Sequence, residues 1–183
     1  MCLHRYSHAY TCWPHHPGYV AAWPLLHHDI ARILDHVQAA GIVLTGPAHG
    51  LPLADPVDGV AFNGDERCGL DGATFTLGPP WTPITTRRYG NAPRGICSTD
   101  RKPYDVAVCA VLLRCLVLLP GLFTVTSNGG WDREWSAGAI WSNDQRNPPH
   151  TAAAAPLSAR GIVTDLFGTA FGPSLLNPGH VIW

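Results

Sequence analysis

Hydrophobic positions in the middle of the chain follow first a helical and then a strand-like pattern. Residues 103–119 are almost entirely apolar, which predicts a buried helix that starts at Pro103 and ends before Pro120. Residues 122–126 alternate apolar and threonine side chains, which is typical of a strand. We expect the helix and the strand to pack on each other in the core, with Arg114 on the outward face of the helix, where it reaches water or an acid.

Two flanking segments show the period of an amphipathic helix. Between Asp29 and Gly41 the apolar side chains recur three and four residues apart, and Gly41 suits the left-handed end of a helix. Residues 158–168 repeat this pattern and end at Gly168. A further short helix is expected over residues 131–141, after an Asn-Gly-Gly turn.

Short runs of strand-forming residues lie between the first two predicted helices. Residues 59–62 and 73–77 have the pattern of a hairpin with a long loop, and residues 42–44 could add another short strand. The predicted fold class is therefore α+β: a small mixed domain over residues 29–168, with a short antiparallel sheet or hairpin packed on three to four helices.

The two ends of the chain lack any regular period. Residues 1–28 hold six of the ten histidines and no acidic residue, which predicts an irregular or disordered arm rich in histidine and aromatic side chains. Residues 169–183 are rich in glycine and proline and are expected to form a loose tail.

Composition narrows the class of protein. A formal net charge of −1 argues against a wholly basic nucleic-acid binder. Residues 87–102, however, carry five basic residues against one acidic residue, a local charge of +4. This segment is the candidate polyanion-binding site, formed by Arg87, Arg88, Tyr89, Arg94, Arg101 and Lys102. The alternative is a solvated basic loop.

Cysteine content and hydropathy bear on the cellular setting. Six cysteines at irregular spacing do not form the disulfide framework of a small secreted domain, which favours a reducing cytoplasm. No signal-peptide pattern opens the chain. The longest apolar run, residues 106–119, is shorter than the ~20 residues that cross a bilayer, so we expect no membrane partner.

Several motifs in the second half of the chain resemble those of known sequences. They are Lys102-Pro103-Tyr104-Asp105, residues 123–129, Trp131-Asp132-x-x-Trp135 and Leu166-Phe167-Gly168. Over residues 102–168 the chain resembles a group of small uncharacterised proteins of high-GC bacteria (actinobacteria) and their phages. The resemblance implies a related fold and no particular chemistry, since that group has no assigned activity. This chain departs from the pattern with Asn128, where the group has an acid.

Histidine and cysteine side chains near the N-terminus are the candidate metal ligands. Imidazole, thiolate and carboxylate are the ligands that zinc prefers. The candidates are His4, His8, Cys12, His15, His28 and Asp29. His28 and Asp29 are similar to the His-Asp core of metal-dependent phosphohydrolases, which need further ligands on later helices. We expect no cofactor, because no Cys-x-x-Cys pair accompanies these residues; the arm is then unstructured, His28 and Asp29 only begin a helix, and zinc binding is the alternative.

Trp131 and Trp135 are four residues apart and share one face of the predicted helix. If exposed they form a platform for a protein partner, and if buried they fill the core. From the sequence we expect a non-enzymatic accessory or interaction protein with an unknown protein partner, derived from a phage or mobile element. The alternatives are a metal-dependent hydrolase that uses the N-terminal histidines and a nucleic-acid-binding module that uses residues 87–102.

Overall fold

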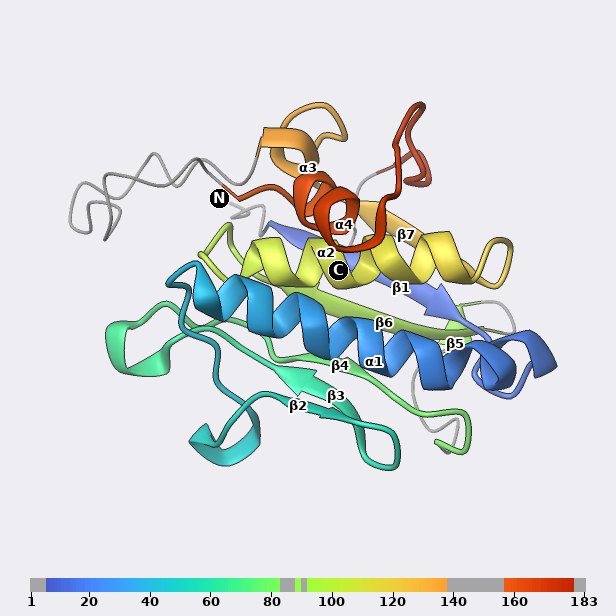
Figure 1. Cartoon of the computed structure of the whole chain (residues 1–183), viewed down its shortest axis with the longest axis horizontal. Helices are drawn as coiled ribbons and strands as arrows, with labels where there is room; N and C mark the ends of the chain where they lie inside the picture. The colour runs from blue at the N-terminus through green and yellow to red at the C-terminus, as the bar shows by residue number, and fades with distance from the viewer. Residues whose placement is uncertain (1–5, 83–87, 90–91, 138–156, 180–183) are drawn as a thin grey trace.

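A computed structural model describes residues 6–82, 88–89, 92–137 and 157–179. Its main sheet has the strand order β5-β6-β1-β7, and every neighbouring pair is antiparallel (Figure 1). The strands are β1 (Ser7–Cys12), β5 (Arg88–Tyr89), β6 (Ala92–Ser98) and β7 (Phe123–Ser127). β1 therefore lies in the interior of the sheet, between β6 and β7.

A second, smaller sheet has the strand order β2-β3-β4. Its strands are β2 (Leu53–Asp55), β3 (Gly59–Phe62) and β4 (Phe75–Leu77). The pairing of Val60 with Leu77 and of Phe62 with Phe75 confirms the predicted hairpin.

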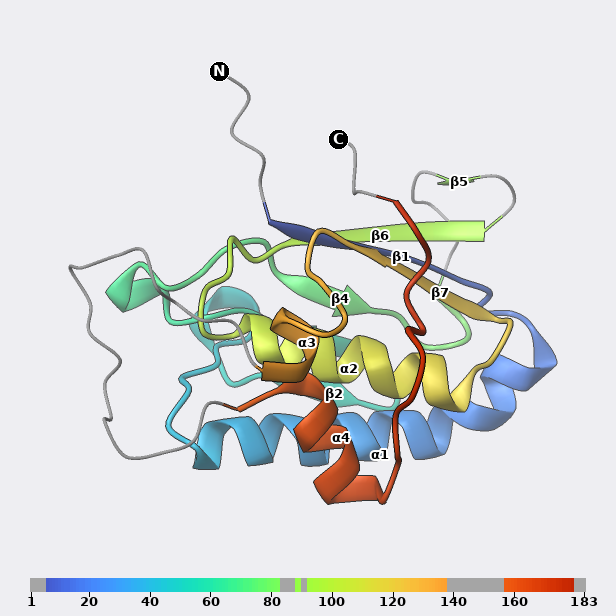
Figure 2. The same cartoon turned by 90° about the horizontal axis from the view of Figure 1, so that it is seen from above.

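The described residues also form four α-helices. They are α1 (Pro17–Ala39), α2 (Asp105–Leu118), α3 (Glu134–Ala137) and α4 (Ala159–Phe167), and two 3-10 turns, η1 (Pro47–His49) and η2 (Glu66–Cys68), lie in the loops. Figure 2 shows α2 between the main sheet and α1. The helices and two antiparallel sheets confirm the predicted α+β class.

The position of α2 explains why its sequence is apolar on all sides. Buried residues occupy every position of the helix from Asp105 to Cys115, because the sheet covers one face and α1 and α4 cover others. Arg114, which we expected on an outward face, is buried and pairs with Asp29 of α1. The helix, β7 and α4 otherwise lie where the apolar pattern predicted them, and Gly41 and Gly168 have the expected positive φ.

The prediction of an irregular arm over residues 1–28 is wrong where the structure describes it. Residues 7–12 form β1, and α1 begins at Pro17 with the His16 side chain accepting a hydrogen bond from the Gly18 N–H. Asp29 consequently lies inside a helix rather than at its start. The physical reason is that aromatic, histidine and cysteine side chains occupy the alternating inward positions of β1, and such residues bury well in a sheet.

Two shorter elements also differ from the prediction. Residues 42–44 form no strand, and only Thr45 makes an isolated bridge, to Asn63. Of the helix expected over residues 131–141, Glu134–Ala137 is helical, and residues 138–141 lie outside the described part of the chain. Within the described residues, no helix combines the length and the hydropathy that a bilayer span requires.

Candidate functional site

A cluster of buried polar side chains lies where β1 and β7 face the N-terminal half of α2. His8 is the second residue of β1, and the antiparallel register places Ser127 of β7 directly beside it. Asp105 and Cys109 are four residues apart on α2, so both side chains are on the same helix face. That face packs on His8, which brings three elements together at one imidazole. We call His8, Asp105 and Cys109 the β1–α2 centre.

The three side chains of this centre are in direct contact. His8 Nε2 lies 2.7 Å from Asp105 Oδ1 and 3.6 Å from Cys109 Sγ. Cys109 Sγ lies 3.8 Å from Asp105 Oδ2. The exposed fractions of the three residues are 0%, 2% and 2% in sequence order, so bulk water does not solvate the centre.

The Asp105 carboxylate accepts hydrogen bonds from more than one side chain. The Thr99 hydroxyl donates to Oδ1, and His8 shares the same oxygen. Asp105 is also in the first turn of α2, where the positive end of the helix dipole favours a carboxylate. Thr99 in the loop before α2 and His8 in the sheet therefore both hold the Asp105 carboxylate in place.

Burial raises the pKa of the Cys109 thiol well above its usual value near 9, and the adjacent Asp105 carboxylate raises it further. In the protein as described the sulfur is therefore protonated and can donate to Asp105. A thiolate would form here only if a cation replaced that proton.

Ser127 determines which nitrogen of His8 carries the proton. The serine oxygen accepts hydrogen bonds from the Gly129 N–H at 2.8 Å and from Trp135 Nε1–H at 3.2 Å. A hydroxyl has two acceptor positions and one proton, so Ser127 is left to donate to His8 Nδ1, 2.9 Å away. We therefore assign the neutral tautomer in which His8 Nε2–H donates to Asp105.

The series Ser127, His8, Asp105 has the order of a serine nucleophile with its base and acid, but its geometry does not suit nucleophilic attack. Both acceptor positions of the serine oxygen are occupied, so no lone pair is directed at a substrate. The donors that would bind an oxyanion point at the serine oxygen itself. Ser127 is a positioning residue for His8.

Tyr6 adds a feature that the rest of the cluster lacks. Its hydroxyl oxygen is buried and is, among the described residues, the one buried side-chain polar atom without a hydrogen-bond partner. The Tyr6 ring meets the His8 ring edge to face at 5.2 Å. Burial raises the pKa of Tyr6 far above its usual value near 10, and the nearby Asp105 and Cys109 raise it further, so the hydroxyl remains a donor.

A strained turn borders the cluster. Asp100 and Arg101 have φ values of 50° and 58°, in the left-handed region that side chains other than glycine rarely adopt. The N–H groups of Thr99 and Asp100 both donate to the Tyr6 carbonyl at 3.1 Å. The Arg101 guanidinium lies 4.4 Å from the centre of the Tyr6 ring and 3.2 Å from Glu134. Strain of this kind is retained where surrounding contacts enforce it, often at functional sites.

Of the metal ligands predicted from the sequence, only His8 lies at this centre. Cys12 is buried at the other end of β1, His15 and His28 are exposed, and Asp29 pairs with Arg114. His4 lies outside the described residues. The sequence reasoning missed Asp105 and Cys109, although two ligand-type residues four apart on a helix are a recognisable metal-binding spacing.

The predicted polyanion-binding residues do not lie on one described surface. Arg87 and the side chains of Arg88 and Tyr89 are outside the described part, and Arg94 lies on β6. Arg101 pairs with Glu134, and Lys102 Nζ donates to the Asp71 carbonyl.

The predicted tryptophan platform is not exposed. Trp131 and Trp135 are both buried, and Trp135 also contacts the His8 ring at 5.6 Å. These two side chains therefore belong to the core beside the cluster, rather than to a surface that a partner could reach.

Comparison with known proteins adds no relative. No family model, no curated protein and no solved structure matches this chain.

Proposed function

We propose that the protein binds one transition-metal ion, with zinc as the preferred metal, at His8, Asp105 and Cys109. The observation that carries the proposal is that imidazole, carboxylate and thiol atoms from β1 and α2 lie within 4.8 Å of one another in the buried core. Nitrogen, sulfur and oxygen in this combination suit zinc better than calcium or magnesium, which prefer oxygen ligands alone.

The distances are close to those of a metal centre. Tetrahedral zinc with ordinary bond lengths separates its ligand atoms by about 3.3–3.8 Å. Cys109 Sγ meets this requirement at 3.6 Å from His8 Nε2 and 3.8 Å from Asp105 Oδ2, whereas His8 contacts the other carboxylate oxygen, Oδ1. The His8–Asp105 hydrogen bond at 2.7 Å must open by about 0.6 Å when a metal replaces the shared proton.

The groups behind the ligands also support the proposal. Histidine ligands usually present their second nitrogen to a hydrogen-bonding partner, and Ser127 is at that position. Metal binding at Nε2 would move the imidazole proton to Nδ1, and Ser127 would accept it only if the longer of its two present hydrogen bonds, from Trp135 Nε1–H at 3.2 Å, opened. Because His8 stays neutral and Cys109 loses its proton, we expect one proton to be released for each metal ion.

The direct test is metal content and affinity. Protein purified without an affinity tag and titrated with zinc against a chromophoric chelator should bind one ion per chain. Cys109→Ala should lower the affinity by at least about 100-fold, since it removes a ligand. Cys115→Ala is the matched control, because Cys115 is buried in the same helix but lies outside the cluster. Equal affinity of the two variants, or no zinc uptake by the parent protein, would contradict the proposal.

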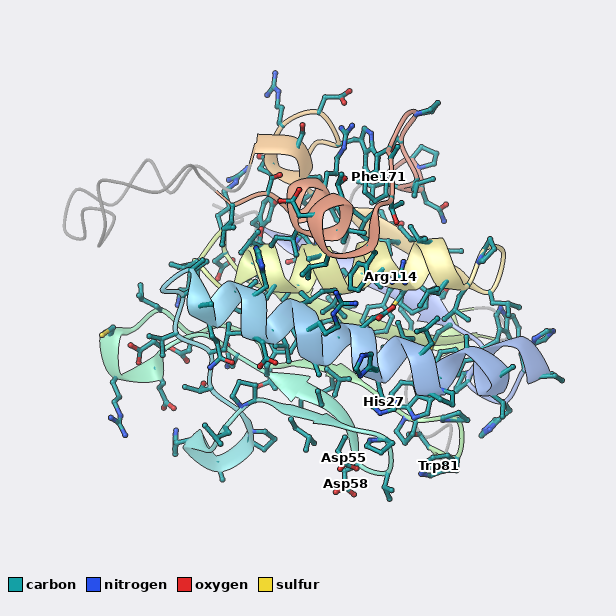
Figure 3. All side chains as sticks on the ribbon, viewed as in Figure 1. His27, Asp55, Asp58, Trp81, Arg114 and Phe171 are labelled. Carbon is teal, nitrogen blue, oxygen red and sulfur yellow. The ribbon has the colours of Figure 1, made fainter. Side chains whose placement is uncertain are left out.

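A second candidate function is the accessory or interaction role expected from the sequence, in the cytoplasm and of phage or mobile-element origin. It is favoured by an exposed apolar pair, Val57 and Trp81, with exposed fractions of 63% and 57%. Trp81 Nε1 donates to the Val57 carbonyl at 3.1 Å, and the Asp55 carboxylate accepts from two N–H groups of the same turn. The pair is therefore held in position by this turn, and Figure 3 shows Trp81 at the edge of the molecule.

The partner that this surface fits is a peptide segment with apolar side chains next to lysine or arginine, because Asp55 and Asp58 belong to the turn that accepts the indole N–H. A labelled peptide that alternates lysine and leucine should bind, and Trp81→Ala should weaken binding at least about tenfold. Trp13→Ala is the control at another exposed tryptophan. Equal binding of a peptide that alternates glutamate and leucine would refute the proposed specificity.

A further inference from the structure

We propose that the metal at the β1–α2 centre keeps one exchangeable position, which takes water, hydroxide or another small monoanion held by the Tyr6 hydroxyl. This inference rests on the proposed metal site. The described residues supply three ligands, whereas zinc ordinarily takes four. Sites with three protein ligands and one exchangeable ligand are those at which zinc activates water or binds small anions.

The Tyr6 hydroxyl is the group that points to a fourth ligand. A buried donor without an acceptor costs free energy, and native proteins rarely leave one unpaired. Tyr6 is 5% exposed, its ring contacts His8, and its hydroxyl lies against Gly129 beside Ser127, so the donor faces the buried cluster rather than water. An oxygen or nitrogen atom bound to the metal would accept this hydrogen bond.

The Gly129 position leaves room for the tyrosine hydroxyl. A Cβ atom at Gly129 would collide with the Tyr6 hydroxyl oxygen and approach the Ser127 oxygen to 3.2 Å. The glycine in the turn after β7 therefore allows Tyr6 and Ser127 to share the same small space. Any larger residue there would displace the donor from the centre.

Charge limits the ligand to a neutral molecule or a single negative charge. Zinc with one carboxylate and one thiolate has no net charge, so a multiply charged anion would leave an excess of negative charge in a buried site. The Arg101 guanidinium over the Tyr6 ring adds positive charge, but Glu134 pairs with it. Size is limited as well, because the Tyr6 and Trp135 rings enclose His8.

Cobalt and azide allow the two proposals to be tested separately. The protein is loaded with Co²⁺, whose visible absorption reports cysteine ligation and coordination number, and is then titrated with sodium azide. We expect a saturable spectral change. Tyr6→Phe should weaken azide binding about tenfold, the value of one hydrogen bond, and should leave cobalt affinity within about threefold. Tyr19→Phe is the control, because that buried hydroxyl bonds to the Gly78 carbonyl on another side of the core.

The outcomes are distinguishable. Failure to bind cobalt would overturn the metal site itself. Cobalt binding with a thiolate absorption band, but with no response to azide or with equal azide affinity in the Tyr6→Phe variant, would overturn the exchangeable position alone. If Tyr6→Phe does not fold, Gly129→Ala provides the second test, because its methyl group displaces the hydroxyl and should weaken azide binding to a similar extent.

Discussion

Two buried acids lie on opposite sides of the core helix α2, and their surroundings differ. On the side of α1 and α4, Asp29 Oδ2 accepts hydrogen bonds from Arg114 Nε at 2.9 Å and Nη2 at 2.6 Å. The Arg114 guanidinium also lies 4.1 Å from the centre of the Phe167 ring, and Figure 3 shows it between the helices. Charge, hydrogen bonding and packing are all satisfied within this group.

The acid on the sheet side is Asp105, and its surroundings are not closed in the same way. It faces an imidazole and a thiol, neither of which needs to be charged, and the same cluster includes the Tyr6 hydroxyl, which has no hydrogen-bond partner within the described part of the chain. A strained turn adjoins it. The comparison indicates that Asp29 with Arg114 stabilises the packing of helices, whereas Asp105 belongs to a group that a further ion would complete.

The largest expected loss of stability comes from breaking the buried ion pair of Asp29 and Arg114. Arg114→Ala leaves the Asp29 carboxylate buried without a counter-ion and should lower the free energy of unfolding by about 3–5 kcal/mol. Urea denaturation measures this loss. The double variant Asp29→Leu with Arg114→Met removes both charges and should recover most of the stability, because well-packed apolar residues replace buried ion pairs at little cost. Zinc affinity should stay unchanged in the double variant, and a large decrease would contradict the separation of the two sites.

Alkaline pH should lower the stability of the folded protein by favouring ionisation of two buried thiols, Cys12 and Cys97, in the unfolded chain. Burial raises the pKa of Cys12 to about 11, and burial together with Asp105 raises that of Cys97 to about 12. Because the folded-state values lie above the ordinary value near 9, their contribution to stability is complete below pH 9, is lost progressively as the pH rises above 9, and is gone above the folded-state values of about 11 and 12. Between pH 8 and pH 10 these two groups should cost the metal-free protein about 2–3 kcal/mol. Urea unfolding at stepped pH checks this, and a flat profile to pH 11 would refute it.

The fold was predictable where apolar side chains carry the pattern, and less so elsewhere. The run before Pro120 predicted α2, and the threonine alternation predicted β7. β1 was missed because its inward positions are His8, Tyr10 and Cys12, which do not resemble an aliphatic strand. Their spacing of two was nevertheless present in the sequence.

The candidate site was predictable only in part, for a related reason. His8 was identified as a ligand, but it was grouped with residues near it in sequence. Its actual partner Asp105 is 97 positions away and comes into contact only because β1 inserts between β6 and β7. No local pattern contains that pairing. Asp105 and Cys109 share a helix face, but their place in an apolar run suggested core packing instead.

A smaller effect is expected at the residue that positions His8. Ser127→Ala removes the acceptor of two N–H groups and the donor to His8 Nδ1 at once. We expect a loss of about 1–3 kcal/mol in unfolding free energy, because buried groups are left unpaired, and a decrease in zinc affinity of about 10–100-fold. Thr124→Val is the control on the same strand, since its hydroxyl bonds only to Thr11 in a partly buried pair. If both variants bind zinc equally, Ser127 does not position the imidazole.

The smallest effect should come from relieving strain in the turn beside the site. Asp100→Gly replaces a side-chain-bearing residue at φ 50° with one that adopts this region freely, although glycine is also more flexible in the unfolded chain. The two contributions oppose each other, so we expect a net gain of at most about 1 kcal/mol in unfolding free energy. Gly69→Ala, at φ 67° in an exposed turn, is the reverse control and should destabilise the protein.

If the strained turn holds Tyr6 in place through the hydrogen bonds to its carbonyl, the stabilised Asp100→Gly variant should bind azide more weakly in its cobalt form. Unchanged azide affinity would mean that the sheet, rather than the turn, positions the tyrosine.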